Sequence, residues 1–362
     1  MKKIFHIVSN NEWGGGEQYV YDLSRRQMAD GISIELFCRP VESVMEKFKE
    51  LGVPVHPLSL HGALDVSSAL GMAAVIRKAS GSTIHAHNFK DAFTAAYARK
   101  LAGRKDVRVV MCRHLTRQGK NTLLYRWLYG QLDKICFDSE ISLYEFLRTR
   151  PDVDRKKLCI VHTSIVLPEQ VDAVDVRKEF DIPEHTVVMM YHGRLDQEKG
   201  LDCLLNAAAQ LKEKDFRLVM VGRGSDAYTA HLHELVAEYG LAEKVVFAGF
   251  RHPILPYVAG ADFGILPSIV REGCPLSPQE YMSQGHPVVT TDNGGQREYV
   301  VDGWNGLLVK AGDCKQLVDA LGKLIDDADL RSRLGVQAKT DYVEKLNYEH
   351  FYQLIKNIYD AD

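Results

Sequence analysis

Two glutamates and two basic residues have the types and spacing that could do chemistry. Glu272 and Glu280 lie eight positions apart, and Arg194 and Lys199 border a loop that follows a strand-like run. Two cations between a strand and a helix suit a diphosphate, because arginine offers a planar fork of donors and lysine a point charge. A carboxylate beside them can accept hydrogen bonds from sugar or ribose hydroxyls. The four residues predict a site for a phosphorylated, hydroxyl-rich ligand, although a lone loop cation is more often simply solvated.

The segment around Glu280 also has a purely structural interpretation. Ser277, Pro278 and Glu280 fit the N-cap, N1 and N3 positions of a helix, which is the pattern of a capping box. On that interpretation the carboxylate would satisfy a backbone N–H instead of a ligand. Glu272 stands in the preceding loop, where no capping role explains it.

Glycines mark two further turns between a strand and a helix. Gly14–Gly16 would let backbone N–H groups approach a ligand, and a helix N-terminus favours an anion; a tight turn without a ligand is the alternative. Tyr19 stands where the dinucleotide fingerprint needs a glycine. Gly222–Ala227 does fit GxGxxA, but no acidic residue closes the next strand to hold an NAD ribose. We therefore expect no NAD.

Three histidines stand at strand ends in the first half. His85 and His87 share one face by strand alternation, and His114 follows the next strand. A metal site is conceivable, but no carboxylate or cysteine is spaced to complete it. Asp152–Asp154 fits the DxD motif of metal-dependent sugar transfer, yet it precedes a strand. We expect no metal, and His87 is the best candidate for contact with a reacting group, with a packed structural histidine as the alternative.

The composition is that of an ordinary globular protein. Of 362 residues, 46% are hydrophobic and 26% charged, and no apolar run approaches the roughly 20 residues that span a bilayer. The N-terminus enters a strand-like segment without the features of a signal peptide. The seven cysteines are scattered without a CxxC pair. We expect a cytoplasmic protein with unpaired thiols and no zinc site.

The net charge of −3 conceals a difference between the halves. Residues 1–165 carry 25 basic and 17 acidic side chains, and the rest of the chain carries 20 and 31. Much of the basic excess lies between Arg99 and Arg126 and runs into the aromatic and apolar stretch Leu123–Tyr129. A solvated face is the simplest interpretation. A membrane surface or lipid pyrophosphate comes next, because such mixtures suit an interface. Nucleic acid is the least favoured partner, and we expect none.

Short β-branched runs alternate with helical patterns, which indicates α/β domains with parallel sheets. The length favours two domains, and Val166–Pro183, poor in apolar residues, marks their junction. We expect two Rossmann-like, doubly wound domains facing a cleft, over residues 1–167 and 168–346. Strands are expected near 3–9, 33–38, 82–87, 108–113, 134–138, 158–162, 186–192, 217–221, 245–248, 262–266, 287–291 and 306–309. Helices are expected between the strands of the first half, for example near 16–29, 91–101 and 140–148. In the second half they are expected near 200–212, 228–239, 278–284 and 314–326, with closing helical segments near 328–344 and 348–359.

In their order along the chain these motifs resemble those of glycosyltransferase family 4, the retaining, nucleotide-sugar-dependent enzymes with the GT-B fold. Gly14–Glu17 is similar to the family's first-turn glycines, and His85–His87 to its strand-end histidine motif. Gly193–Gly200 is similar to its phosphate-binding loop, and Glu272 with Glu280 to its Glu-x7-Glu signature. The resemblance covers nearly the whole chain.

The resemblance implies a role for each matching residue. Arg194 and Lys199 would hold the donor diphosphate and stabilise the departing nucleotide. Glu280 would bind the ribose, Glu272 the transferred sugar, and His87 would line the cleft near the anomeric carbon. Further donor contacts are implied for Gly15, Gly16, Gly193, Pro275, Leu276 and Ser277, and for backbone groups around Arg251. The last helix, 347–362, would pack back on the first domain.

The implied activity is transfer of a hexosyl-type sugar, with retention, from a nucleotide sugar (a UDP-sugar is favoured) to a glycan or lipid-linked acceptor. The setting would be bacterial surface polysaccharide or lipopolysaccharide synthesis, in the cytoplasm with peripheral contact at the inner face of the membrane. The two cations would stabilise the leaving group, so neither a metal nor a cofactor is expected. The alternatives are a nucleotide-sugar 2-epimerase or hydrolase that needs no acceptor, and a non-catalytic nucleotide-sugar-binding partner.

The sequence departs from the family's pattern at two places. His162–Ile165 stands where the family often has Asn-Gly-Ile/Val-Asp, at the expected junction. Tyr281 replaces a small residue in the frequent Glu-Ala-Met-Ala string, next to Glu280. A bulky tyrosine there raises the question of what it does beside a ribose-binding carboxylate.

Overall fold

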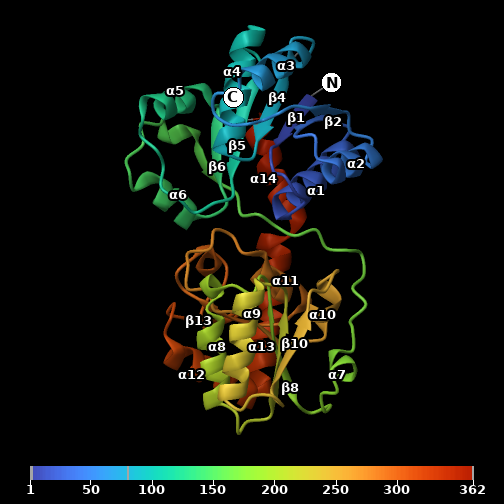
Figure 1. Cartoon of the computed structure of the whole chain (residues 1–362), viewed down its shortest axis with the longest axis vertical. Helices are drawn as coiled ribbons and strands as arrows, with labels where there is room; N and C mark the ends of the chain where they lie inside the picture. The colour runs from blue at the N-terminus through green and yellow to red at the C-terminus, as the bar shows by residue number, and fades with distance from the viewer. Residues whose placement is uncertain (1–2, 80, 361–362) are drawn as a thin grey trace. The chain divides into compact units, whose positions relative to one another are not determined.

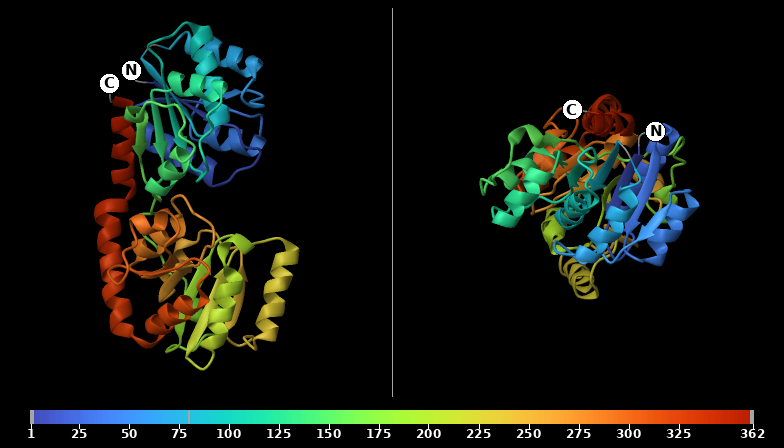
Figure 2. Two further views of the ribbon diagram at one scale, coloured as in Figure 1. Left: turned by 90° about the vertical axis from the view of Figure 1, so that its left-hand side faces the viewer. Right: turned by 90° about the horizontal axis from the view of Figure 1, so that it is seen from above.

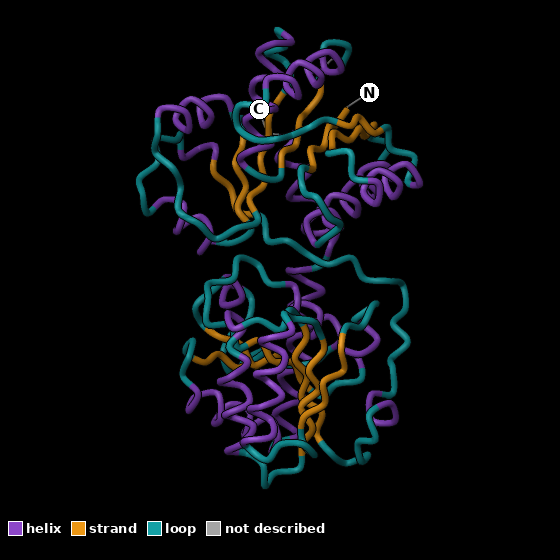
Figure 3. Tube along the Cα trace, in the orientation of Figure 1, coloured by secondary structure: helices purple, strands orange, loops and turns teal. Residues whose placement is uncertain are grey.

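The computed structural model describes residues 3–79 and 81–360, which form two compact units along the chain (Figures 1 and 3). The first unit holds the residues up to His162 and those from Phe351 onward, and the second holds Thr163–His350. The sequence placed these divisions after residues 167 and 346. Each unit contains one sheet of parallel strands, so the expected pair of Rossmann-like α/β domains is confirmed.

The first unit is built on a seven-stranded parallel sheet. Its elements are β1 (Lys3–Val8), α1 (Gly15–Ala29), β2 (Ser33–Cys38), α2 (Glu42–Glu50), β3 (Val55–Pro57), α3 (Val66–Ile76), β4 (Ser82–Ala86), α4 (Phe89–Ala102), β5 (Arg108–Arg113), α5 (Leu123–Gln131), β6 (Lys134–Phe137), α6 (Glu140–Leu147), the 3-10 turn η1 (Arg155–Lys157), β7 (Leu158–Ile160) and, at the chain's end, α14 (Tyr348–Asp360). The strand order is β3-β2-β1-β4-β5-β6-β7, which reverses direction between β1 and β4. Figure 2 shows α14 against this sheet, where Arg108 Nη1 donates to Tyr359 O at 2.9 Å.

The second unit has the same winding in a sheet of six strands instead of seven. Its elements are α7 (Val176–Glu179), β8 (Val187–His192), η2 (Gln197–Lys199), α8 (Leu201–Gln210), β9 (Phe216–Val221), α9 (Asp226–Glu238), β10 (Val245–Gly249), α10 (Leu255–Ala259), β11 (Phe263–Leu266), α11 (Leu276–Gln284), β12 (Val288–Thr291), η3 (Gly295–Glu298), β13 (Leu307–Val309), α12 (Cys314–Asp326), α13 (Ala328–Asp341) and the π-helical turn η4 (Tyr342–Leu346). The strand order is β10-β9-β8-β11-β12-β13, all parallel. The reversal here lies between β8 and β11.

Apolar runs that are buried on both faces explain why the central strands read as continuous hydrophobic segments. All six residues of β8 are buried. All five residues of β4 are buried too, although this strand includes the polar residues Ser82, Thr83 and His85. Helices cover both faces of a parallel sheet, so its strands need no polar side. In the second unit α8, α9 and α12 pack on one face through residues such as Leu204, Leu232 and Leu321. Helices α7, α10, α11 and α13 cover the other, with Val176 and Val258 in its core.

Most expected strands and helices lie within a few residues of the observed ones. The short edge strand β3, Val55–Pro57, was not predicted, because three residues ending in proline give little alternation to read. The junction also contains the helix α7, whose Val176 is buried in the second core. Among the described residues, no helix is both long and apolar enough to cross a bilayer.

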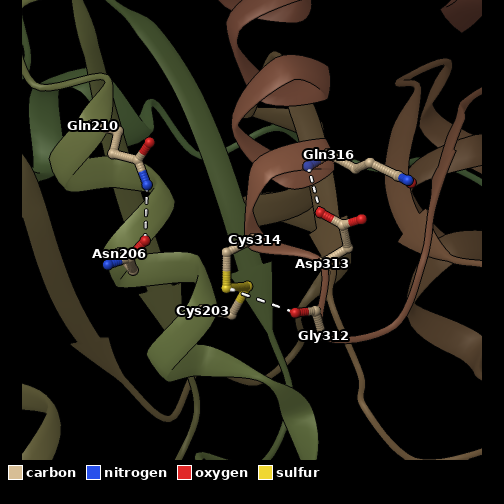
Figure 4. The surroundings of a disulfide bond; sticks show 7 residues. All are labelled: Cys203, Asn206, Gln210, Gly312, Asp313, Cys314 and Gln316. Atoms are coloured by element: carbon tan, nitrogen blue, oxygen red, sulfur yellow. Dashed lines mark hydrogen bonds between the residues drawn. A yellow bond between two sulfur atoms is a disulfide. The ribbon is translucent and has the colours of Figure 1, made fainter.

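A disulfide joins Cys203 in α8 to Cys314 at the start of α12, as Figure 4 shows. The expectation that the thiols are unpaired is wrong for these two residues. They are 111 positions apart, and they meet because α8 and α12 pack side by side on one face of the second sheet. No local sequence pattern predicts a disulfide between cysteines so far apart in the chain. The other five cysteines form no disulfide: Cys38, Cys112, Cys136, Cys159 and Cys274.

Replacing both cysteines of the disulfide with serine is expected to lower the free energy of unfolding of the second unit by about 2–4 kcal/mol, because a long loop is no longer closed in the unfolded chain. Denaturant unfolding of the Cys203→Ser/Cys314→Ser protein measures this, and dithiothreitol should produce the same loss in the parent. Cys159→Ser, at a free and partly buried thiol, is the matched control. Equal stability of parent and double variant under oxidising conditions would contradict the prediction.

Candidate functional site

The predicted cations and one predicted glutamate lie at the same edge of the second sheet. Ligands of doubly wound sheets bind outside the carboxyl ends of the strands where the strand order reverses. Here that point lies between β8 and β11. β8 ends at His192 and leads into the loop with Arg194 and Lys199, and β11 leads into the loop with Glu272. The topology therefore delivers these side chains to one place.

Lys199 and Glu272 form an ion pair. Lys199 Nζ lies 2.5 Å from Glu272 Oε1, and Ser268 Oγ donates to the same oxygen at 2.6 Å. The two charged side chains are only 16% and 18% exposed. Partial shelter from water strengthens such a pair relative to a surface ion pair. A cation and a carboxylate are thus held side by side, one suited to a phosphate and the other to sugar hydroxyls.

Glycine at position 200 makes this pairing possible. Its backbone is left-handed, with φ +70°, and a Cβ there would lie 2.2 Å from Pro267 O. No other residue fits so close to the neighbouring loop. The contact is completed by Ile269 N, which donates to Glu198 O at 2.9 Å. Together they fix the turn that carries Lys199 against the loop that carries Glu272.

The GxGxxA pattern of the second unit has a packing explanation. A Cβ on Gly222 would lie 1.8 Å from Gly193 O, and one on Gly224 would lie 2.0 Å from Leu195 O. Leu195 N also donates to Arg223 O at 2.8 Å. These glycines let the loop after β9 pack backbone to backbone against the loop that carries Arg194, so the pattern is accounted for without a dinucleotide.

The Arg194 backbone is fixed while its guanidinium stays exposed. Tyr191 Oη donates to Arg194 O at 2.5 Å, and burial, followed by the charge of Glu272, raises the pKa of this phenol far above its usual range. The guanidinium is 70% exposed and contacts Asp196 Oδ2 at 3.0 Å. Its donors are therefore accessible to a ligand at the sheet edge.

Glu280 does not cap its helix, which corrects the capping-box interpretation. The helix α11 begins at Leu276 with Pro275 as N-cap, so Ser277 is the second helical residue. Glu280 Oε2 instead lies 2.5 Å from His192 Nε2 at the end of β8. The glutamate is thus bound to the strand that opens the candidate site.

Tyr281 orients this histidine. Its hydroxyl donates to Met190 O at 2.8 Å, so its oxygen accepts from His192 Nδ1, also at 2.8 Å. The second nitrogen of His192 then faces the Glu280 carboxylate. A Cβ on Gly264 would lie 2.1 Å from the Tyr281 ring, so glycine in β11 makes room for the tyrosine. Tyr281, which stands where the family often has a small residue, therefore orients the histidine that contacts Glu280.

Tyr281→Phe is expected to destabilise the second unit by about 1–3 kcal/mol, because it leaves His192 Nδ1 buried without this partner and removes a hydrogen bond to Met190 O. Denaturant unfolding measures the loss. Tyr228→Phe is the matched control: its hydroxyl donates to Asp202 Oδ1 at 2.8 Å at a partly exposed position where water can replace it. Equal losses in the two variants would show that the Tyr281 hydroxyl holds nothing.

The N-terminus of α11 offers unpaired backbone donors to the same region. It has no side-chain cap, and the first N–H groups of any helix lack partners within the helix. Leu276 and Ser277 supply the first of these groups, and the helix dipole adds partial positive charge. Pro275 is anchored from behind, since its carbonyl accepts from Tyr299 Oη at 2.6 Å.

The turn after β10 holds Arg251 by its side chain. Arg251 Nη2 lies 3.2 Å from Glu179 Oε1, and its guanidinium lies 5.7 Å from the centre of the Tyr257 ring. The side chain of Arg251 thus contacts Glu179 and Tyr257. The backbone around Arg251 is the part that the resemblance implies to face a nucleobase. Beside it the exposed Phe250 ring carries the Arg223 guanidinium at 4.9 Å, a pair that the sequence did not single out.

In the first unit, Gly15 and Gly16 begin α1 directly after the turn that follows β1. A Cβ on Gly15 would meet nothing within 4 Å, and one on Gly16 would approach only Asn10 Nδ2 at 3.6 Å. Neither glycine is required by the packing of this unit. Glu17 accepts from Gly14 N at 3.1 Å and from Asn10 Nδ2, which fixes the turn.

The histidines of the first unit form a larger cluster than the sequence predicts. The rings of His85 and His87 lie 4.2 Å apart, as strand alternation requires, and His114 stacks on His87 at 6.1 Å. His6 joins them from β1, with Nδ1 3.1 Å from His87 Nε2. Sequence reasoning missed His6 because it stands alone in an apolar strand. Only the pairing of β1 with β4 reveals it, because that register places His6 opposite His85.

Two other residues of the second-unit site were also missed. His192 is the partner of Glu280, although it belongs to none of the motifs singled out in the sequence. Ser268 carries no motif, and it reaches Glu272 only because β11 ends beside the loop. The His192–Glu280 contact joins segments 88 positions apart, so no local spacing predicts it. The Ser268–Glu272 contact spans four positions of a loop, where no regular periodicity marks it.

Comparison with known proteins matches each unit to a glycosyltransferase family model. The family model described as Glycosyltransferase Family 4 matches residues 13–167, and the one described as Glycosyl transferases group 1 matches residues 173–341. D-inositol 3-phosphate glycosyltransferase of Corynebacterium diphtheriae is 38% identical over 170 residues, which are 45% of this chain and 40% of the relative. The lipopolysaccharide core biosynthesis glycosyltransferase LpsE of Rhizobium meliloti is 32% identical over 180 residues, 50% of this chain and 51% of that protein. The chain thus spans about half the length of these relatives or less.

A solved structure shares the fold over nearly the whole chain. Anabaena HepE in complex with UDP superposes with a TM-score of 0.85 and 19% identity, covering 99% of this chain and 100% of HepE.

Proposed function

Since this chain belongs to glycosyltransferase family 4, we propose that it transfers a hexosyl-type sugar from a nucleotide-sugar donor to a glycan or lipid-linked acceptor. The observation that carries the proposal is the Lys199–Glu272 pair at the reversal point of the second sheet. The pair sets a cation suited to a diphosphate beside a carboxylate suited to sugar hydroxyls. A sugar nucleotide carries a diphosphate and a sugar next to each other.

The remaining donor contacts follow from the elements around this pair. Arg194 would grip the diphosphate with its exposed guanidinium, and the N–H groups of Leu276 and Ser277 would add donors from the start of α11. Glu280, held through Oε2 by His192, would present its other oxygen to the ribose. We favour UDP as the nucleotide, and the UDP complex of the similarly folded HepE supports that choice.

Breaking the bond between sugar and diphosphate places negative charge on the leaving group. Arg194 and Lys199 would stabilise that charge as it develops, which is the usual largest contribution to such catalysis. We propose that these cations make a metal and a cofactor unnecessary at the donor site. Asp154 accepts from Lys156 N as the cap of η1, so this residue of the DxD pattern has a structural role.

We propose retention of the anomeric configuration, with the acceptor attacking from the face that the diphosphate leaves. The leaving oxygen would then take the acceptor's proton. His87, Gly15 and Gly16 would contribute from the first unit, His87 beside the reacting sugar and the glycines against the phosphates.

The acceptor side is proposed to be anionic or membrane-bound. In the first unit Leu123 is 83% exposed at the start of α5, and Leu115 and Tyr144 are also exposed. Lys120 and Arg126 lie in the same stretch of chain. Exposed apolar residues among cations suit the inner, anionic face of a bacterial membrane. The name of LpsE supports a role in lipopolysaccharide or other surface polysaccharide synthesis.

Product analysis with a panel of UDP-sugars tests the proposal. We expect no change of the donor alone, and release of UDP with a new glycoside when extracts of lipid-linked glycans are added. Free sugar or an epimerised nucleotide formed without any acceptor would replace the proposal with a hydrolase or a 2-epimerase. Tight binding of a nucleotide sugar with no turnover under any condition would identify a non-catalytic binding partner.

A further inference from the structure

Four imidazoles lie in one layer between the first sheet and the helices α1 and α14. His6 and His85 are register neighbours on β1 and β4, and His87 and His114 follow β4 and β5. His6 and His85 are fully buried. Buried polar groups in proteins are nearly always hydrogen-bonded, so the partners of these rings define what the layer does.

The partners form one continuous chain of hydrogen bonds from α14 to His87. Tyr359 Oη lies 2.7 Å from His85 Nδ1 and 3.1 Å from Gln27 Nε2. Gln27 Oε1 lies 2.8 Å from His6 Nε2, and His6 Nδ1 lies 3.1 Å from His87 Nε2. We call these five residues, His85, Tyr359, Gln27, His6 and His87, the relay.

The amide of Gln27 sets the direction of every bond in the relay. Its Oε1 accepts only, so His6 carries its proton on Nε2 and offers a bare Nδ1. His87 must then donate from Nε2 to that nitrogen, which leaves His87 Nδ1 bare. On the other side Gln27 Nε2 donates to Tyr359 Oη, so the phenol donates its own hydrogen to His85 Nδ1. All three histidines are thereby fixed as Nε2–H tautomers.

This assignment requires neutral rings, and burial makes them neutral. Desolvation lowers the pKa of His6 to about 4, and it lowers the pKa of His85 and of His87 well below the usual range. Each ring then has one donor and one acceptor. The two atoms that the relay does not use, His85 Nε2 and His87 Nδ1, are buried and have no partner within the described chain.

A metal ion is the other way to use such a cluster. His6, His85 and His87 each offer a nitrogen within 4.8 Å of the others. A tetrahedral zinc ion needs ligand nitrogens about 3.4 Å apart, from its bond lengths of about 2.0–2.1 Å. Both nitrogens of His6 are already used in hydrogen bonds at 2.8 and 3.1 Å, so a metal would have to break the relay. The geometry therefore favours the hydrogen-bonded arrangement.

We propose that Gln27 and Tyr359 are positioning residues: Gln27 acts through His6 to fix the tautomer of His87, and Tyr359 fixes the tautomer of His85. The tautomers follow from the relay alone, whereas the place of His87 beside a sugar rests on the proposed function. The inference also gives α14 a role, because the last helix of the chain sets the state of His85 in β4.

Long-range proton–nitrogen correlation spectra of protein labelled with ¹⁵N-histidine test the relay without an activity assay. We expect His6, His85 and His87 to show Nε2–H tautomers at pH 7.5 and to stay neutral down to pH 5.5. Gln27→Met removes the acceptor of His6, so His6 and His87 are expected to populate both tautomers. Gln27→Glu restores an acceptor and should restore the His87 signal. Gln18→Met, on the exposed face of the same helix, is the matched control.

Tyr359→Phe provides a milder second variant should Gln27→Met fold poorly. It removes the donor to His85, and only the His85 tautomer is expected to lose its preference. An Nδ1–H tautomer of His87 in the parent protein, an unchanged His87 spectrum in a folded Gln27→Met, or one equivalent of tightly bound zinc would overturn the relay. A relay that behaves as expected in a protein that never turns over a nucleotide sugar would overturn the proposed function and leave the relay standing.

Discussion

Lys199→Ala is expected to lower the turnover number for sugar transfer by about 100-fold or more, with a smaller effect on donor affinity. The lysine would stabilise charge that appears on the diphosphate only as the bond breaks, so its loss acts on the transition state more than on the bound donor. Steady-state kinetics with the preferred nucleotide sugar separates the two effects. This is the largest single-residue effect that the site predicts.

The substitution also leaves Glu272 with Ser268 as its remaining partner, so folding must be checked separately. Thermal unfolding supplies that check, and Lys212→Ala, at an exposed position of the second unit, is the matched control. An unchanged turnover number in a folded Lys199→Ala protein would remove the lysine from the mechanism. A loss confined to KM would assign it to donor binding alone.

The first unit is expected to lose much of its stability between pH 7 and pH 5. Burial lowers the pKa of His6 and of His114 to about 4, while in the unfolded chain both titrate near 6.5. As the pH falls through this window, the unfolded state binds protons at these two histidines and the folded state does not. Each histidine therefore lowers the free energy of unfolding by about 2 kcal/mol between pH 7 and pH 5. His85 and His87, whose pKa values are also lowered by burial, add to the loss in the same direction.

Asp91 opposes this effect. Burial raises its pKa to about 7, so the folded state holds a proton that the unfolded state lacks, and stability is gained as the pH falls toward 5. That gain is about 2 kcal/mol. The four histidines outweigh one carboxyl group, and the net change remains a loss.

Denaturant unfolding at pH 7 and pH 5 in a Trp304→Phe background measures the first unit, because the other two tryptophans, Trp13 and Trp127, lie within it. His114→Phe keeps the ring against Tyr19 and should recover about 2 kcal/mol of the loss at pH 5. Identical acid losses in the parent and in His114→Phe would show that this histidine is not held neutral.

The two sheets were predictable because their signal is local and repeated. Most strands are short apolar runs, and both sheets wind in the same way. The main elements and the edge that carries Lys199 and Glu272 could therefore be placed from the sequence. The resemblance to a known family supplied the roles of the residues. What the sequence could not supply are contacts between distant segments, such as Cys203 with Cys314 or His6 with His87.

The start of α11 illustrates how a tertiary contact overrides a local pattern. Ser277 has the spacing of an N-cap, yet the helix begins one residue earlier, at Leu276. Gln279 is fully buried and donates to Thr163 O at 2.8 Å, and Tyr281 is buried against β8. These contacts fix the rotation of the helix, and they turn Glu280 toward His192 rather than toward its own N-terminus.

Thermal stabilisation by nucleoside diphosphates in the presence of EDTA tests the central claim most directly, because it needs neither the sugar nor the acceptor. We expect one diphosphate, UDP before GDP, to raise the melting temperature without metal, by an amount equivalent to about 2.7 kcal/mol at 100 times its dissociation constant. The shift should shrink in Glu280→Gln and persist in Lys212→Ala. No shift with any nucleoside diphosphate would contradict a donor site at Arg194, Lys199 and Glu280, and a shift that appears only when magnesium or manganese replaces EDTA would contradict its independence from metal.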